Sequence, residues 1–226
     1  MKAIALLSGG KDSFLSINIA LMLGIEMEAT ITVVPSQDSM MFHHPNAHLG
    51  SVISNCLGIR NITVEEDEFE DAVSKFPKKL LVAGAIESDY QKSRLEEMCE
   101  KYGLTPFFPL WRKNNESLLL EFISTGSSGI FTSVAAEGLD ETLLGREINE
   151  ESLEILRIAK KRHRISLVGE GGEYETLVIS SPFENCFIKI ERTSVVDRGI
   201  QKNLLVEEYT VVTPSGNEKR QTGLSI

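Results

Sequence analysis

The 226-residue chain has only three cysteines, Cys56, Cys99 and Cys186, and none of them belongs to a C-x-x-C pair. Without such a pair the sequence indicates neither a zinc site nor a redox dithiol. It also has no apolar run of membrane-spanning length, and residues 2–7 read directly as a strand instead of a signal peptide. From these absences we expect a cytoplasmic protein with no membrane partner.

Positive charge is scarce as well, since the formal net charge is −10. Proteins that bind nucleic acids usually present a basic face, so we expect no direct nucleic-acid partner. One basic run, Lys160–Arg164, stands at the end of a predicted helix, where cations interact favourably with the helix dipole. Two interpretations of this run stay open: a solvated helix terminus, or a contact for an acidic partner.

Two common phosphate-binding motifs are also missing. The Walker pattern requires glycine, four residues and then Gly-Lys-Ser/Thr, but here Gly10-Lys11 is followed by Asp12 and the first glycine position is Ala5. The dinucleotide pattern Gly-x-Gly-x-x-Gly does not occur either. What is present is Ser-Gly-Gly-Lys-Asp-Ser at residues 8–13, between a predicted strand and a predicted helix.

This short segment has the residues that an anion site requires. Gly9 and Gly10 allow backbone N–H groups to converge on a phosphate, and the following helix N-terminus adds partial positive charge. Lys11 adds a full charge, Asp12 can hold a magnesium ion, and the hydroxyls of Ser8 and Ser13 are donors. The alternative interpretation is a Gly-Gly turn followed by a Ser or Asp helix cap.

The first part of the chain alternates strands and helices. Strands are predicted at 2–7, 28–34, 61–64 and 80–85, and helices at 14–23, 46–57, 68–76 and from Ser88 to about 102. This alternation predicts an α/β fold with a doubly wound parallel sheet over residues 1–104. Ligands of such sheets bind at the carboxyl ends of the strands, where the phosphate loop, the segment from Pro35 and Gly84–Ser88 all lie.

The pattern changes near Thr105, where Pro106, Pro109 and the only tryptophan, Trp111, mark a junction. A smaller C-terminal α+β domain is therefore expected over residues 105–226. Helices are predicted at 116–124, 141–146 and 150–162, and strands at 129–134, 187–191 and 204–212, the last two antiparallel. No element is predicted beyond Pro214, because the residues there are polar.

A second unusual stretch, Gly169–Thr176, reads Gly-Glu-Gly-Gly-Glu-Tyr-Glu-Thr. Its glycines allow close approach of the backbone to a ligand. Its carboxylates, Glu170, Glu173 and Glu175, can bind cations or act as bases. The alternative interpretation is an acidic surface turn within a hairpin.

The two stretches resemble those of known enzymes. Residues 8–13 resemble the pyrophosphate loop of the ATP pyrophosphatase superfamily, and Glu170–Thr176 resembles the signature of the diphthine–ammonia ligase family. Further matching segments are Met41–Asn46, in which His44 replaces the family's usual threonine, Gly84–Arg94, Pro109–Trp111, Gly138–Asp140 and Leu144–Arg146. The resemblance extends from residue 2 to about residue 190.

The resemblance implies a fold of the adenine nucleotide alpha hydrolase type (HUP) and an ATP-dependent ligase that requires Mg²⁺. The enzymes of this family adenylate the carboxylate of diphthine, a modified histidine on elongation factor two, and release pyrophosphate. Ammonium then gives the amide of diphthamide and AMP. Because position 2 is Lys and not a catalytic Cys of a glutaminase, free ammonium is the expected donor.

The resemblance and the loop chemistry together assign candidate residues. Catalysis is assigned to Lys11, Asp12, Glu170, Glu173 and Glu175. Nucleotide contacts are assigned to Ser8, Gly9, Gly10, Lys11, Asp12, Ser13, Val33, His43 and Gly84, and the metal to Asp12. Substrate contacts are assigned to Tyr90, Gln91, Arg94, Gly171, Gly172 and Thr176.

Two rival functions stay open at this point. One is another pyrophosphatase-type ligase that acts on transfer RNA or on a small metabolite, which a basic groove or a cysteine pair would favour. The other is a non-catalytic adenine-nucleotide sensor, which would need the phosphate loop but not the acidic stretch. The oligomeric state is open too, and a homo-oligomer is compatible with the sequence.

Overall fold

The computed structural model describes residues 1–35 and 45–223, which belong to two units, Met1–Arg112 and Lys113–Ile226. The sequence placed the boundary between residues 104 and 105 instead. The difference arises at β5 (Thr105–Phe107), because this short strand pairs with β4 (Leu80–Val82) and so belongs with the first unit. The two units are nearly equal in length.

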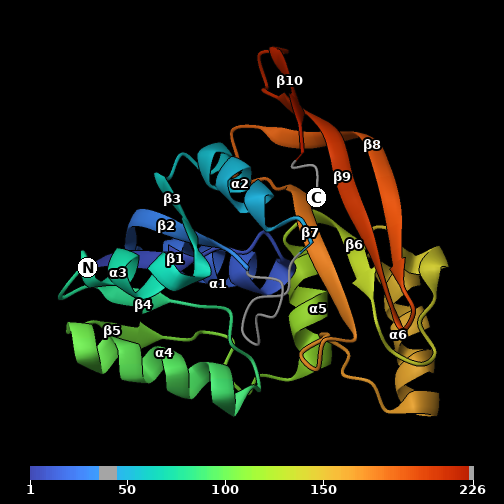
Figure 1. The fold of residues 1–226 in the computed structure, drawn as a ribbon, viewed down its shortest axis with the longest axis horizontal. Coiled ribbons are helices and arrows are strands. Elements are labelled where there is room, and N and C mark those ends of the chain that lie inside the picture. Colours follow the sequence, from blue (N-terminus) through green and yellow to red (C-terminus); the bar gives the residue numbers. More distant parts are fainter. Residues whose placement is uncertain (36–44, 224–226) are drawn as a thin grey trace. The chain divides into compact units, whose positions relative to one another are not determined.

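The first unit contains the parallel sheet predicted from the sequence, in the order β3-β2-β1-β4-β5. Its other strands are β1 (Lys2–Leu6), β2 (Glu26–Val34) and β3 (Asn61–Glu65). Its helices are α1 (Lys11–Met22), α2 (Gly50–Cys56), α3 (Phe69–Ser74) and α4 (Asp89–Tyr102), with 3₁₀ turns at Ala47–Leu49 and Glu66–Glu68 (Figure 1). All four strand pairs are parallel.

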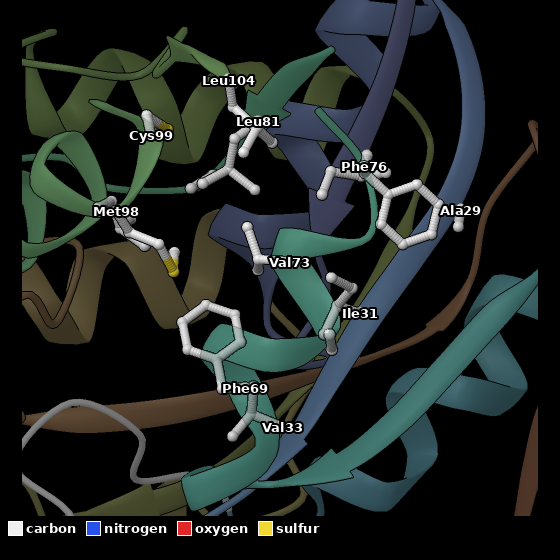
Figure 2. Close-up of a cluster of buried hydrophobic side chains, with 14 residues drawn as sticks. Ala29, Ile31, Val33, Phe69, Val73, Phe76, Leu81, Met98, Cys99 and Leu104 are labelled. Carbon is white, nitrogen blue, oxygen red and sulfur yellow. The ribbon is translucent and has the colours of Figure 1, made fainter. Parts of the chain in front are cut away.

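Helices cover both faces of this sheet. On one face, side chains of β1, β2 and β4 pack against α3 and α4 in a cluster that includes Ile31, Leu81 and Phe69 (Figure 2). Cys99 lies in the same cluster, and burial raises the pKa of its thiol to about 11. On the other face, Thr30 Oγ1 of β2 donates a hydrogen bond of 2.7 Å to Ser54 Oγ of α2.

The strand order locates the point where the chain reverses direction across the sheet. β1 lies in the middle, β2 and β3 follow on one side, and β4 and β5 follow on the other. The carboxyl ends of β1 and β4 therefore flank the topological switch point, which is where open α/β sheets bind ligands. Residues 8–13 directly follow β1, and Gly84 follows β4, as the sequence predicted.

The second unit is built on antiparallel pairing. Its sheet has the order β10-β9-β6-β7, and β8 pairs with β9. The strands are β6 (Ser128–Val134), β7 (Tyr174–Ser180), β8 (Phe187–Arg198), β9 (Gln201–Val212) and β10 (Glu218–Thr222), and the helices are α5 (Asn115–Ser124), the 3₁₀ turn Glu141–Leu143 and α6 (Glu150–His163). Among the described residues, no helix is both long and apolar enough to cross a membrane.

Most predicted elements of the second unit are confirmed, but strands β7, β8 and β10 differ from the prediction. The polar segment beyond Pro214 was expected to lack structure, but β10 forms there and pairs with β9 from Glu218 opposite Val212 to Thr222 opposite Glu208. β8 continues from the predicted end at Glu191 to Arg198, because the β9 hairpin partner continues beside it. β7 was not predicted as a strand, because its first residues belong to the acidic stretch Gly169–Thr176, which was interpreted as a loop.

Candidate nucleotide and substrate loops

The phosphate loop begins where β1 ends and closes where α1 begins. Gly9 has a φ of 90°, and Gly10 is the N-cap residue of α1. Among the described residues, the N-cap position Gly10 makes no side-chain cap of this 12-residue helix. In general, the backbone N–H groups at a helix N-terminus favour an anion, and the helix dipole adds favourable charge.

Hydroxyl groups fix the shape of the loop. The Gly10 N–H donates to Ser8 Oγ over 3.3 Å, and Ser13 Oγ donates to the Gly10 carbonyl oxygen over 2.9 Å. Ser8 Oγ and Ser13 Oγ are 3.2 Å apart. The two ends of the loop are thus held together before any ligand binds, which reduces the ordering cost of binding.

Lys11 and Asp12 form the charged part of the loop. The Lys11 ammonium is 2.9 Å from Asp12 Oδ2, and Lys11 is only 4% exposed. A buried ammonium needs such a partner, because burial without one is costly. No group of three His, Cys, Asp or Glu side chains suited to a metal occurs in the part of the chain that the structure describes. Asp12 provides a single carboxylate at the loop, and nucleotide magnesium sites in general combine one or two carboxylates with phosphate oxygens of the nucleotide.

Gly84 is brought against the phosphate loop by the fold. A Cβ atom at this position would lie 2.7 Å from the Asp12 carbonyl carbon and 2.7 Å from the Ser13 nitrogen. Only glycine allows the backbone after β4 to pass so close to the start of α1. The sequence assigned Gly84 to the nucleotide site, and the structure brings it together with the loop.

Support for the loop comes from a residue that the sequence interpretation missed. Thr32 Oγ1 donates a hydrogen bond of 2.9 Å to the Leu7 carbonyl oxygen, at the point where β1 leads into the loop. Asn61 Nδ2 donates in turn to Thr32 Oγ1 over 2.9 Å and to Thr30 Oγ1 over 2.8 Å. The alternation of Thr30 and Thr32 in a buried strand was the available signal, since buried hydroxyls require partners.

Val33 and His43 were also assigned to the nucleotide. Val33 is 6% exposed and its side chain packs in the hydrophobic cluster with Phe69 (Figure 2), so only its backbone is near the strand end. His43 lies outside the described residues. Close to it in the sequence, burial lowers the pKa of His48, whose Nε2 atom is buried and has no hydrogen-bond partner among the described residues.

The segment after Gly84 carries the residues assigned to the substrate in the first unit. Tyr90 is 53% exposed at the start of α4. The Gln91 N–H donates to Ser88 Oγ over 3.3 Å, so the backbone of Gln91 completes the predicted N-cap. Arg94 lies 3.8 Å from Glu70 and 3.9 Å from Glu97, in ion pairs that are exposed and therefore weak.

Trp111 lies near the same segment. The ammonium of Lys92 is 5.4 Å from the ring centroid, and the guanidinium carbon of Arg112 is 5.5 Å from it. The Arg112 N–H donates to the Ile86 carbonyl oxygen over 2.8 Å. Trp111 is thus held by two cations against the strand end that carries Gly84–Ser88.

The acidic loop of the second unit is held by one of its own carboxylates. Glu173 Oε1 accepts a hydrogen bond from the Ser166 N–H over 2.7 Å, and Oε2 accepts from the Gly171 N–H over 2.8 Å. The Gly172 N–H also donates to the Gly169 carbonyl oxygen over 3.0 Å. Because hydrogen bonds to a charged group are the strong ones, Glu173 fixes the turn between Ser166 and Gly171.

The neighbouring residues anchor this turn to the sheet. The Tyr174 hydroxyl donates to the Leu167 carbonyl oxygen, and its ring lies edge-on to Phe131 at 5.0 Å. Gly169 has a φ of 77°, and a Cβ there would lie 2.8 Å from the Tyr174 carbonyl oxygen. Only glycine therefore fits at position 169, and the loop has a fixed shape.

The remaining residues of the acidic loop differ in exposure. Glu170 and Glu175 are half-buried, while Gly171 and Gly172 are exposed. Glu175 lies opposite Ser133 in the sheet, and Thr176, which is 3% exposed, lies opposite Phe131. Thr176 was assigned to the substrate, and the structure places it among buried strand residues.

Comparisons with known proteins give matches in both units of the chain. The model of the diphthamide synthase N-terminal domain matches residues 1–106, and that of the diphthamide synthase C-terminal domain matches residues 114–211. A diphthine–ammonia ligase of Bos taurus is 31% identical over 87% of this chain and 85% of its own length. A diphthine–ammonia ligase of Schizosaccharomyces pombe is 31% identical over 87% of this chain, which spans 37% of that longer protein.

A solved structure shows a weaker similarity. It is described as a predicted subunit of tRNA methyltransferase from Methanocaldococcus jannaschii, and it aligns with a TM-score of 0.45 at 19% identity, over 80% of this chain and 98% of that chain.

Proposed function

The chain belongs to the diphthine–ammonia ligase family, and from this premise we propose that it amidates the carboxylate of diphthine on elongation factor two. ATP is the proposed co-substrate, free ammonium the nitrogen donor, and AMP and pyrophosphate the by-products. The reaction is the last step of diphthamide synthesis. Its support is that the family match covers both units and includes both loops.

The single observation that best supports the proposed use of ATP is the position of the phosphate loop. It lies at the switch point of the parallel sheet, with Gly84 packed against its backbone. We expect Lys11 and the N–H groups at the start of α1 to bind the pyrophosphate as it leaves, since preorganised charge stabilises developing negative charge. Mg²⁺, held by Asp12 and phosphate oxygens, would supply further charge neutralisation.

The acidic loop suits the substrate half of the reaction. Diphthine has a cationic trimethylammonium group and ammonium is a cation, so carboxylates match both, whereas they repel the phosphates of ATP. We assign the proton-accepting and cation-facing roles to Glu170 and Glu175. Glu173, also a candidate for catalysis, already accepts two backbone hydrogen bonds, and we propose that it acts by holding the loop.

Two measurements on one reaction mixture test this function. The protein is incubated with ATP, Mg²⁺, ammonium and diphthine-bearing elongation factor two. Chromatography of the nucleotides is expected to show AMP and pyrophosphate, and mass spectrometry of the factor is expected to show the amide. ADP and phosphate as the main products would overturn the assignment, and binding of ATP without turnover would favour a nucleotide sensor.

A further inference from the structure

The C-terminal end of α6 is basic and exposed. We call residues Lys160, Lys161, Arg162, His163 and Arg164 the basic helix end. The four Lys and Arg residues are exposed, and the His163 side chain is 27% exposed, in a chain whose net charge is −10. The proposed amidation uses none of them.

Four of the five residues of the basic helix end have no ion pair with a described residue, unlike several other cations of their unit. Arg157 Nη2 lies 2.6 Å from Glu116, Arg192 Nη2 lies 2.9 Å from Glu208, and Lys202 Nζ lies 2.5 Å from Glu141. Within the described part of the chain, no ion pair involves Lys160, Lys161, Arg162 or Arg164, while His163 has one contact of 3.5 Å with Glu137. Ion pairs with the residues that the structure describes therefore leave the positive charge of the helix end largely unneutralised.

The basic helix end is rigidly connected to the acidic loop. Arg164 ends the helix with a φ of 60°, and the next residues are anchored in the core, with Ile165 6% exposed and Leu167 2% exposed. Between them, the Ser166 N–H is held by Glu173 of the acidic loop. The basic helix end and the acidic loop have opposite charge, and the short segment at residues 164–166 connects them in a fixed conformation.

The start of this segment is fixed as well. The His163 ring lies against the backbone of Gly138, where a Cβ atom would overlap it. The helix end therefore cannot rotate without displacing the loop that carries Gly138.

We propose that the basic helix end docks an acidic segment of the protein substrate while the acidic loop receives the cationic head of its modified side chain. The proposal rests on the proposed function, because it takes diphthine-bearing elongation factor two as the substrate. A pair of adjacent patches of opposite charge fits a protein that carries a cation beside carboxylates, and it fixes the orientation of approach.

A polynucleotide is the less suitable occupant. Its phosphates extend over many Debye lengths, each about 8 Å at physiological salt, and so meet the negative charge of the rest of the chain. A short acidic peptide segment, by contrast, interacts mainly with the positive charge of the basic helix end.

The test removes three charges without disturbing the helix. Glutamine is a good helix former, so we choose the triple variant Lys160→Gln, Lys161→Gln, Arg162→Gln and leave the packed His163 and the positive-φ Arg164 unchanged. The matched control removes the same charge from other exposed positions without a positive φ, Arg60→Gln, Arg198→Gln and Lys219→Gln.

Two readouts are expected to change in the triple variant and not in the control. Since exposed charge pairs contribute modestly one by one, the KM for diphthine-bearing elongation factor two is expected to rise roughly tenfold, with kcat at saturating factor and the KM for ATP unchanged. Surface plasmon resonance without ATP is expected to show the same loss of affinity, and the salt dependence of binding is expected to become weaker.

The outcomes separate this proposal from the proposed function. Equal affinities for the factor in the triple variant, the control and the wild type overturn the docking proposal, even if amidation proceeds. Absence of amidation overturns the proposed function, while the binding measurement still decides docking. Competition by an unrelated RNA that is lost in the triple variant assigns the surface to a polynucleotide and also overturns the proposal.

Discussion

The two glycine-rich loops of this chain are stabilised in opposite ways. In the phosphate loop, glycine lets a second strand end approach the backbone, and Lys11 and Asp12 pair with each other. In the acidic loop, Glu173 holds the backbone of its own turn. The first loop therefore places the Lys11 ammonium at the start of α1. In the second, Glu173 fixes the turn that carries Glu170, while Glu175 lies on β7. Two loops of similar glycine content are thus held in shape by different contacts.

The largest expected effect comes from removing the carboxylate of the phosphate loop. Asp12→Ala is expected to lower adenylation roughly a hundredfold or more, because one preorganised electrostatic group is lost. Pyrophosphate exchange measures it. Asp12→Asn keeps an oxygen for the Lys11 ammonium and should lose activity while changing the melting temperature less.

The matched control for this change is Asp71→Ala, which removes a 74%-exposed carboxylate of the same unit. It is expected to leave adenylation unchanged. Near-normal turnover of Asp12→Ala at ordinary magnesium concentrations would show that Asp12 takes no part in the reaction. The proposed contrast between the two loops would then not hold.

A smaller effect is expected from the residue that holds the acidic loop. In Glu173→Gln, the amide group keeps one acceptor but turns a donor toward either the Ser166 or the Gly171 N–H. Loss of one charged hydrogen bond is expected to lower amidation about tenfold and to speed hydrogen exchange at Gly171, with ATP affinity unchanged. Calorimetry measures ATP binding, and the mass of the factor measures amidation.

A double-mutant cycle with Glu170→Gln sharpens this result. If Glu173 acts by positioning the loop that carries Glu170, the two losses should not add. Fully additive losses would show independent roles. If both single variants lose ATP affinity in parallel with amidation, the acidic loop contacts the nucleotide and not the substrate. If both variants keep full amidation, the loop is only a surface turn.

The smallest effect concerns stability in the second unit. Burial raises the pKa of Glu184 to about 8, so the folded state favours its protonated form. Since the unfolded carboxyl ionises near pH 4.5, stability is lost as the pH rises from about 4.5 to 8. The melting temperature of Glu184→Gln should therefore exceed that of the wild type increasingly over this range.

The control for this titration is Glu100→Gln, which removes an exposed carboxylate of α4. Its melting temperature should follow that of the wild type at every pH. A constant difference between Glu184→Gln and the wild type from pH 4.5 to 8 would show that Glu184 does not titrate in this window.

The sequence predicted the parallel sheet well, because each of its buried strands forms an apolar run between helices. It missed β5 and β10 for a physical reason. Pro106 stands inside β5 and Glu218, Lys219 and Arg220 form most of β10, yet both strands lie at a sheet edge, where proline and charges are tolerated. Such strands are specified by their neighbours and not by their own pattern.

The same limit applies to the candidate site. Residues 8–13 were located by their motif, since consecutive residues build that loop. The hydrogen bonds of Glu173 and the buried position of Val33 were not predictable, because each depends on which distant or neighbouring groups the fold brings within reach. A motif identified the carboxylates, whereas the partner of each carboxylate depended on the tertiary structure.

Trp111, held between Lys92 and Arg112, has a practical consequence as the chain's single indole. Excitation at the red edge of protein absorption selects this one fluorophore. Its emission reports on the surroundings of Trp111, beside the strand end that carries Gly84. Nucleotide titrations can therefore be followed without a label, and equally in variants of the acidic loop, whose substitutions introduce no second emitter.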